Sequence, residues 1–155
     1  MNEPRSSQPI AYRTSLRWEH NREGELASSL HPHRPPLHID LGGPGDHWTP
    51  GELLVGAVES CTVATLLALA RRSGLMLAAC SSNATGTLEA DKHGYSFSVI
   101  ALSIHVTVTT EADRERAAAI IRQAEETCFV CRSLNTNVTV DYTIEVVGSP
   151  DAGRR

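Results

Sequence analysis

The residues of this sequence best suited to chemistry are its cysteines, because a thiolate is both a nucleophile and a redox centre. They are Cys61, Cys80, Cys128 and Cys131. Cys61 and Cys128 each fall on the apolar face of a predicted helix, so both thiols can point into one core. A thiol that attacks a peroxide becomes a sulfenic acid, and a second thiol nearby converts the acid to a disulfide. The pairing leaves two interpretations open for Cys61 and Cys128, redox chemistry and a small hydrophobic core residue. We interpret Cys80 as a core residue.

Cys61 lies midway along a predicted helix over residues 49–72. Pro50 is typical of a first helical position, and Gly74 of a position just beyond the end. The stretch 53–70 is apolar on nearly every side, although its interspersed polar residues favour a buried helix over a membrane span. A chain of 155 residues has little other structure to surround such a helix. We therefore predict an obligate dimer.

The remaining elements predict an α+β fold with a β-hairpin, a third strand, the central helix, two strands, a second helix and a last strand. The apolar phase flips between Val99 and Ile100, which indicates a bulge, and Thr110 with Asp113 resembles a helix N-cap pair. We expect one domain over 11–147, with flexible ends at 1–10 and 148–155. The predicted strands are 12–18, 25–30, 37–41, 76–91, 95–110 and 138–146, and the second helix carries Ala117, Ile120, Ile121, Ala124 and Cys128 on one face.

Composition narrows the functional classes. The formal net charge is −4 and no block of Lys or Arg occurs, so nucleic acid is not expected as a partner. No apolar segment follows the polar first eight residues, so no signal peptide is expected. Four cysteines without a secretion signal indicate reduced thiols in a reducing compartment, which predicts a cytoplasmic protein. No cofactor and no membrane partner are expected.

Two segments resemble the OsmC/Ohr family, named for osmotically induced and organic hydroperoxide resistance proteins. The segment 49–62, TPGELLVGAVESCT, is similar to the P-x-E-L-L-x-x-A-x-x-x-C-T motif, and 128–134, CFVCRSL, is similar to C-P-V-x-R-x-L. The resemblance runs from about Trp18 to Val146. It implies antiparallel sheets around the long helix and an intertwined dimer with two interfacial active sites. It also implies that Cys61 attacks the peroxide, that Cys128 resolves the sulfenic acid, and that a dithiol of the lipoyl type is the reductant.

The sequence departs from the family pattern at several positions. Gly51 stands where the organic hydroperoxide branch has a Glu, and Glu52 follows it, which favours the broader OsmC-like group. Phe129 replaces the usual Pro, and Glu59 stands where small residues are usual. Cys131 is an additional thiol that could share the resolving role with Cys128.

The expected reaction needs a cation, because a thiolate must form and an alkoxide must leave. The segment HNREG resembles the G-G-R-x-G turn of the organic hydroperoxide branch, which points to Arg22, with Arg17 as the second choice and a solvated turn residue as the alternative. Glu52 is the candidate to hold this Arg, or is a carboxylate that only favours the helix N-terminus. Nine helical residues separate it from Cys61, about 13 Å along the axis, so it would act from a frayed helix start or from the other subunit.

Two further interpretations remain open. Cys128-x-x-Cys131 could form half of a zinc site completed by His31 and His33, or by His38, although only one such cysteine pair exists. Alternatively, the protein could be a non-catalytic redox sensor or bind a small apolar ligand. The sequence as a whole favours a thiol peroxidase of oxidative-stress defence that acts on organic hydroperoxides, with hydrogen peroxide as an additional candidate substrate.

Overall fold

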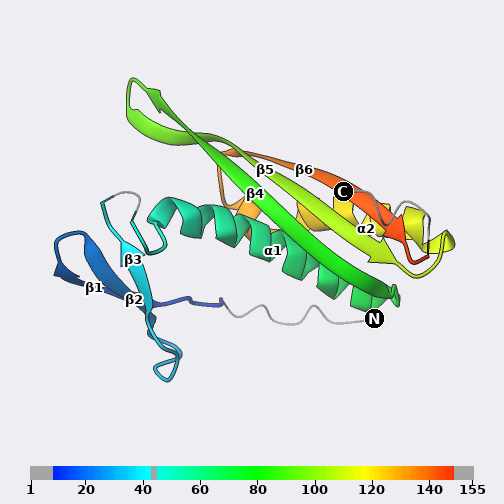
Figure 1. Ribbon diagram of the computed structural model, residues 1–155, viewed down its shortest axis with the longest axis horizontal. Helices are drawn as coiled ribbons and strands as arrows, with labels where there is room; N and C mark the ends of the chain where they lie inside the picture. Colours follow the sequence, from blue (N-terminus) through cyan, green and yellow to red (C-terminus); the bar gives the residue numbers. More distant parts are fainter. Residues whose placement is uncertain (1–8, 43–44, 149–155) are drawn as a thin grey trace. The chain divides into compact units, whose positions relative to one another are not determined.

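In the computed structural model, which describes residues 9–42 and 45–148, the chain begins with a small antiparallel sheet. Its strands are β1 (Thr14–His20), β2 (Glu23–Ser28) and β3 (Leu37–Asp40), in that order (Figure 1). They belong to the first of two compact units, Met1–Pro50 and Gly51–Arg155, each of which is described by itself. Most of the predicted flexible ends, residues 1–8 and 149–155, lie outside the described residues.

The turn of the β1–β2 hairpin is two residues shorter than its sequence predicts. His20 pairs with Glu23, so Asn21 and Arg22 alone connect the strands. Asn21 has a φ of 48°, a left-handed conformation that Asn tolerates better than most residues. The tight turn places Arg22 at the tip of the hairpin, and β2 starts at Glu23 rather than at residue 25.

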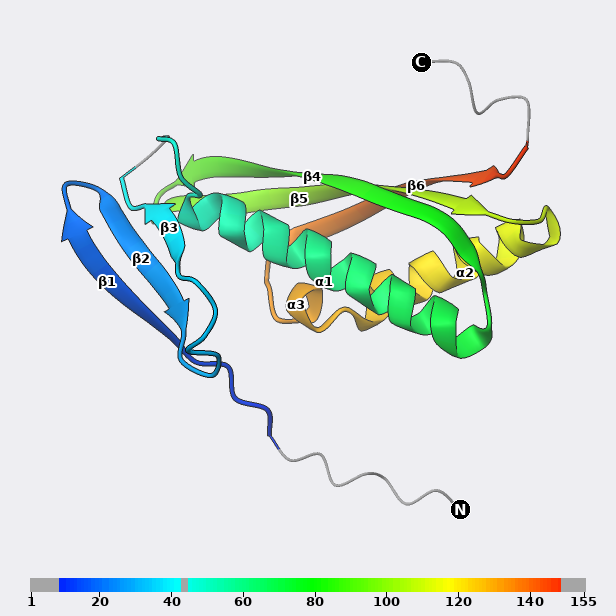
Figure 2. The same ribbon diagram turned by 60° about the horizontal axis from the view of Figure 1, so that its bottom comes forward.

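The second unit packs its helices on one face of a three-stranded sheet with the order β4-β5-β6 (Figure 2). This arrangement agrees with the predicted α+β class and with the predicted order of elements. The elements are α1 (Pro50–Ser73), β4 (Leu77–Asp91), β5 (Gly94–Val108), α2 (Ala112–Thr127), α3 (Phe129–Arg132) and β6 (Asn137–Val146).

The expectation of antiparallel sheets is wrong for one pair of strands, because β6 runs parallel to β5. Parallel neighbours need a long crossover, and the α2–α3 segment supplies it. The predicted bulge in β5 is present within a residue or two of the expected position. Thr87 and Leu88 are consecutive on β4 but pair with Val99 and Phe97, which leaves Ser98 as the extra residue.

Helix α1 buries a single stripe of its surface within the chain. Val58, Thr62, Leu66 and Ala70 are buried, and their spacing of four residues places them on one face of the helix. This stripe packs against buried residues of β5, such as Ile100 and Ile104, and of α2. By length and composition α1 would also suit a membrane span, and only 22% of its most apolar window is buried. The sequence predicts a helix that is buried on nearly every side, but within one chain α1 is buried on one side only.

Candidate active site

Cys61 lies near the middle of α1, beside the buried stripe rather than on it. Its nearest helical neighbour on the same flank is Thr65, whose hydroxyl donates to the Cys61 carbonyl at 2.8 Å. The backbone N–H groups in the interior of a helix are occupied by i to i−4 bonds. The Cys61 thiol therefore receives its backbone hydrogen bond from another element, through the N–H of Val130 in α3.

Cys128 lies at a break between two helices, not on the continuous face of α2 that its sequence spacing predicts. Helix α2 ends at Thr127, and Cys128 has φ −59° and ψ 115°. Its N–H donates to the carbonyl of Ala124 at 2.9 Å and its own carbonyl accepts from Arg132 at 3.0 Å. The residue therefore ends α2 and begins α3. Its side chain is fully buried, with 0% exposure.

Three of the four thiols meet beside this break. The side chains of Cys61 and Cys128 interact and shift each other's pKa, and Cys128 also interacts with the thiol and the backbone N–H of Cys131. Cys131 influences Cys61 only through charge, so Cys128 is the middle member of the group. The Thr62 hydroxyl, from the buried stripe of α1, lies 3.4 Å from the Cys131 sulfur. We refer to Cys61, Cys128 and Cys131 as the thiol cluster.

The three members of the thiol cluster ionise differently. Burial raises the pKa of Cys61, and the Cys128 thiol and its charge raise it further, against hydrogen bonds from Val130 and Thr65. Burial also opposes ionisation of Cys128, but hydrogen bonds from Thr62, Cys131 and Cys61 outweigh it and lower the pKa of Cys128. Burial and the neighbouring thiols raise the pKa of Cys131 to about 11. The negative charge of the cluster therefore belongs chiefly to Cys128.

Thr62 supports this order of ionisation through a single proton. Its hydroxyl donates to the carbonyl of Val58 at 2.9 Å, which leaves its lone pairs free to accept from the thiol of Cys131. When the same proton turns toward Cys128, it stabilises the Cys128 thiolate. The Thr62 hydroxyl lowers the pKa of Cys131 as well, but there burial and the neighbouring thiols outweigh it, so Cys131 stays protonated beside the more readily ionised Cys128. Sequence reasoning missed this residue, although a polar side chain on the inner stripe of an apolar helix was a usable signal.

The thiol that is accessible from a cavity is Cys61, not Cys128. Cys61 lines an open cavity of about 420 Å³ that runs along the outer flank of α1, whereas Cys128 and Cys131 are not in its lining. The wall is mostly apolar near Cys61, and Arg72 and Gln123 supply polar groups. Arg72 lies eleven residues beyond Cys61, about 16 Å along the helix axis. The lining consists of Cys61, Ala64, Thr65, Ala68, Leu69, Arg72, Gln123, Thr127 and Phe129.

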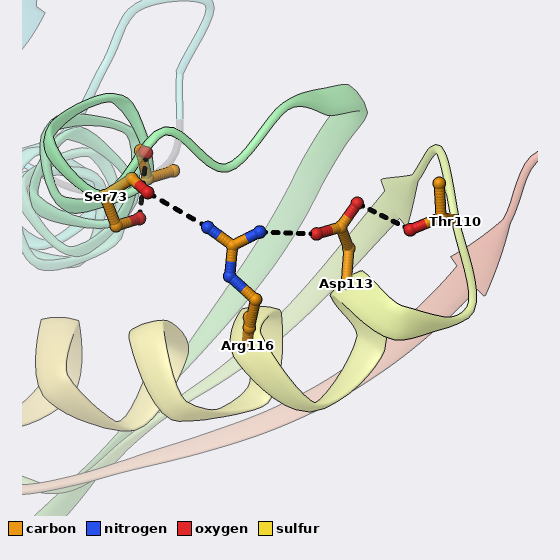
Figure 3. Close-up of polar contacts among 5 residues, drawn as sticks. Ser73, Thr110, Asp113 and Arg116 are labelled. Atoms are coloured by element: carbon orange, nitrogen blue, oxygen red, sulfur yellow. Dashed lines mark hydrogen bonds and ion pairs between the residues drawn. The ribbon is translucent and has the colours of Figure 1, made fainter.

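A polar network joins the end of α1, the helix that carries Cys61, to the start of α2, the helix that ends just before Cys128 (Figure 3). The Arg116 guanidinium donates to the Ser73 carbonyl at the end of α1 at 3.0 Å and pairs with Asp113 at 2.7 Å. The Thr110 hydroxyl donates to the other oxygen of Asp113 at 2.7 Å. The predicted pair of Thr110 and Asp113 is thus in contact, but the N-cap residue of α2 is Glu111, without a side-chain cap bond. The network fixes the end of α1 against the start of α2.

Arg22, the predicted cation, belongs to the first unit and is held there by the segment that follows β3. Its Nη1 donates to the carbonyl of Gly42 at 2.8 Å. A Cβ on Gly42 would lie 1.9 Å from the Arg22 Cδ, so glycine allows the stem of the arginine to cross the chain at this point. Arg17, the second choice, forms an ion pair with Glu25 at 2.5 Å. Arg22 is therefore an exposed but oriented guanidinium.

The other predicted residues occupy the following places. Glu52 lies in the first turn of α1, and both it and Cys61 are helical, so they lie about 13 Å apart along the axis of one chain. Glu59 accepts a hydrogen bond from the Ser82 hydroxyl at 2.6 Å, which joins α1 to β4. Cys80 packs against the core, and burial raises its pKa. Within the described residues, no three His, Cys, Asp or Glu side chains could hold a metal ion, so the alternative zinc site is not assembled there.

The fold and the site define a class of α+β proteins in which a long helix and a broken second helix bring cysteines together. The family model of OsmC-like proteins matches residues 43–143, and the chain belongs to the OsmC-like protein family. This finding confirms the resemblance seen in the sequence.

Individual relatives agree with this assignment. The chain is 26% identical over 110 residues to the uncharacterized protein YmaD of Bacillus subtilis, covering 69% of this chain and 73% of that one. An OsmC-like protein of unknown function from Vibrio cholerae has a similar structure, with a TM-score of 0.76, 17% identity and coverage of 87% of this chain and 100% of that one. An organic hydroperoxide resistance protein from Elizabethkingia anophelis also has a similar structure, with a TM-score of 0.69, 14% identity and coverage of 90% of this chain and 99% of that one.

Proposed function

We propose that this protein is a cysteine-based hydroperoxide reductase in which Cys61 attacks an organic hydroperoxide and Cys128 resolves the product. The observation that carries the proposal is the contact between a cavity-lining thiol and a fully buried one. Membership of the OsmC-like family supports it, since organic hydroperoxide resistance proteins share the fold. The proposed setting is oxidative-stress defence in the cytoplasm.

The chemistry proceeds in two balanced steps. The Cys61 thiolate attacks the O–O bond, so that Cys61–SH and ROOH give Cys61–SOH and ROH. The Cys128 thiolate then attacks the sulfenic sulfur, and Cys61–SOH with Cys128–SH gives a disulfide and water. The lowered pKa of Cys128 suits the second step, because it increases the fraction of Cys128 present as the attacking thiolate. An external dithiol, for which a lipoyl-type compound is the proposed candidate, reduces the disulfide.

The first step needs help from outside the thiol cluster. The influences that set the pKa of Cys61 are burial, the Cys128 thiol, a hydroxyl and one backbone N–H, and their sum favours the neutral thiol. A nearby guanidinium would reverse this preference and would stabilise the departing alkoxide. We propose Arg22 for this role, from the same chain or from a second subunit, with Glu52 of either chain as the carboxylate that orients it.

The proposal is tested by steady-state reduction of cumene hydroperoxide with dihydrolipoamide as reductant. Cys61→Ser should abolish turnover, because a serine hydroxyl is barely ionised at neutral pH and attacks peroxides poorly. Cys80→Ala is the matched control and should retain turnover, since Cys80 packs in the other part of the core. Full activity of Cys61→Ser would contradict the proposal.

A second candidate function is favoured by the raised pKa of Cys61, which suits slow, stoichiometric oxidation. A redox sensor, or a binder of small apolar ligands, would use the same cavity without recycling. A single Cys61-dependent loss of one equivalent of hydroperoxide, with no turnover in dihydrolipoamide or in thioredoxin, would favour the sensor. Repeated turnover with either reductant would exclude it.

We also propose that the protein is an obligate homodimer. Most of α1 is incompletely covered within one chain, and Leu67, Met76 and Phe129 are 44%, 71% and 59% exposed. Exposed apolar area of this kind favours association with a second copy. Sedimentation should show a dimer at micromolar concentration. A folded and stable monomer under the same conditions would contradict the proposal.

A further inference from the structure

We propose that Cys131 is a third redox residue, which replaces Cys61 as the disulfide partner of Cys128 by thiol–disulfide exchange. The exchange releases Cys61 as a thiol while the protein is still oxidised. This inference rests on the proposed function and names one further step of it. The step begins from the Cys61–Cys128 disulfide and ends in a Cys128–Cys131 disulfide.

The order of contacts in the thiol cluster carries the proposal. Cys128 caps the start of α3 and Cys131 lies three residues further on, with its sulfur 3.4 Å from the hydroxyl of Thr62, the residue that follows Cys61 in α1. The thiols of Cys61 and Cys131 both interact with the thiol of Cys128, whereas Cys61 acts on Cys131 only through charge. In thiol–disulfide exchange the attacking and leaving sulfurs both bond to one central sulfur. Cys128 occupies this central position, with its two possible partners already in contact with it.

The chemistry of the exchange balances without an external oxidant or reductant. The Cys131 thiolate attacks the sulfur of Cys128, the bond between Cys61 and Cys128 breaks, and Cys61 leaves as a thiolate. The proton that Cys131 loses is taken up by Cys61 or by solvent. In total, Cys131–SH and Cys61–S–S–Cys128 give Cys128–S–S–Cys131 and Cys61–SH.

The first disulfide also removes an obstacle to the attack. In the reduced protein, burial raises the pKa of Cys131, and the thiol and charge of Cys128 with the charge of Cys61 raise it further. A disulfide has no charge and no proton, so these contributions from Cys61 and Cys128 vanish once the two are joined. The backbone supports the same direction, because Cys61–Cys128 joins two separate helices whereas Cys128–Cys131 lies within the short turn of α3. The short turn can adjust more easily than α1 can move.

The released Cys61 faces the cavity again, so it can meet a second peroxide before any reductant arrives. With Cys128 and Cys131 joined, no partner thiol of the cluster remains, and Cys61 then stays a sulfenic acid. Without Cys131, Cys61 would instead stay protected in its disulfide. A second equivalent of peroxide should therefore oxidise Cys61 to a sulfenic acid when Cys131 is present and should not do so when Cys131 is absent.

The test follows reduced protein after mixing with one equivalent of cumene hydroperoxide, with acid quenching, alkylation and disulfide mapping by mass spectrometry. The wild type should form Cys61–Cys128 first and then replace it with Cys128–Cys131. In Cys131→Ser, and in Cys131→Ala as a second variant, Cys61–Cys128 should persist. A second equivalent, given with dimedone, should label Cys61 in the wild type and leave both variants unlabelled.

Three results would overturn the relay. If Cys61–Cys128 forms and persists equally in the wild type and in both variants, the relay is wrong while the peroxidase proposal stands. If Cys128–Cys131 is the first product, the order of the steps is wrong. If peroxide is not consumed and no disulfide forms, the relay and the proposed function both fail.

Discussion

Cys61 lies inside a continuous helix of 24 residues, whereas Cys128 lies where α2 ends and α3 begins. The interior of a helix has no spare backbone N–H, while the first turn of a helix has several. The first turn of α3 gives one N–H, from Val130, to Cys61 and another, from Cys131, to Cys128. Cys61 receives no other backbone bond among the groups that set its pKa, and Cys128 also gains two thiols and the Thr62 hydroxyl.

A reactive thiol needs access to its substrate and a low pKa, and these two properties belong to different cysteines in this protein. The α1 position gives Cys61 access to a cavity but leaves its pKa raised. The break gives Cys128 a lowered pKa but buries it completely. The thiol that a peroxide can reach is therefore not the thiol that ionises most readily. The proposed division between an attacking and a resolving cysteine follows from this difference.

Removal of the buried member should have the largest effect. In Cys128→Ser, recycling should stop and Cys61 should over-oxidise, which intact mass measurement detects as added oxygen. The first turnover should survive, and its rate should rise at lower pH than in the wild type. Cys128 raises the pKa of Cys61, so its loss lowers that pKa and thiolate forms at lower pH. A single-turnover pH profile that stays in place or moves to higher pH would contradict this account.

Removal of the cation should have the next largest effect. Within the part of the chain that the structure describes, no cation is among the groups that set the pKa of Cys61, so Arg22→Ala should slow peroxide reduction about a hundredfold or more. Stability should change little, since Arg22 is an exposed turn residue with one hydrogen bond to Gly42. Arg17→Ala is the matched control on the same hairpin. Full activity of Arg22→Ala together with an inactive Arg17→Ala would show that the wrong arginine was chosen.

Substitution of the two threonines of α1 should have the smallest effects, and each substitution should slow a different step of the reaction. Thr62 lowers the pKa of Cys128, so Thr62→Val should slow disulfide formation about fivefold, as expected for one hydrogen bond of about 1 kcal/mol. Thr65 lowers the pKa of Cys61, so Thr65→Val should slow peroxide attack to a similar extent. Rapid-mixing measurements of peroxide loss and of disulfide formation distinguish the two. Equal effects of both variants on both steps would contradict the separation.

Periodicity and capping residues predicted most of the fold. They gave α1 to within a residue or two at each end, the strands of both sheets and the bulge in β5. The parallel pairing of β6 was not predicted, because the strand pattern alone does not give direction. The break at Cys128 was also missed, since Phe129 and Val130 continue the apolar pattern and offer no Gly or Pro that would indicate a turn.

The candidate site was predictable in its thiols and less so in its supporting groups. Cys61 and Cys128 were found from their positions on apolar helix faces, and Cys131 from its spacing. Thr62 and the N–H groups of α3 were not found, because their effect depends on how α1 packs against α3 in space. The order of ionisation within the cluster likewise depends on contacts between residues more than sixty positions apart in the sequence.

The most direct test of the division of roles isolates each thiol in turn and measures reaction with one equivalent of cumene hydroperoxide. One protein carries Cys128→Ser with Cys131→Ser, and the other carries Cys61→Ser with Cys131→Ser; both retain Cys80. We predict that the first consumes the peroxide and gives a dimedone adduct at Cys61, while the second does not react on the same timescale. Reaction of the second protein at an equal or higher rate, with the adduct at Cys128, would contradict the account.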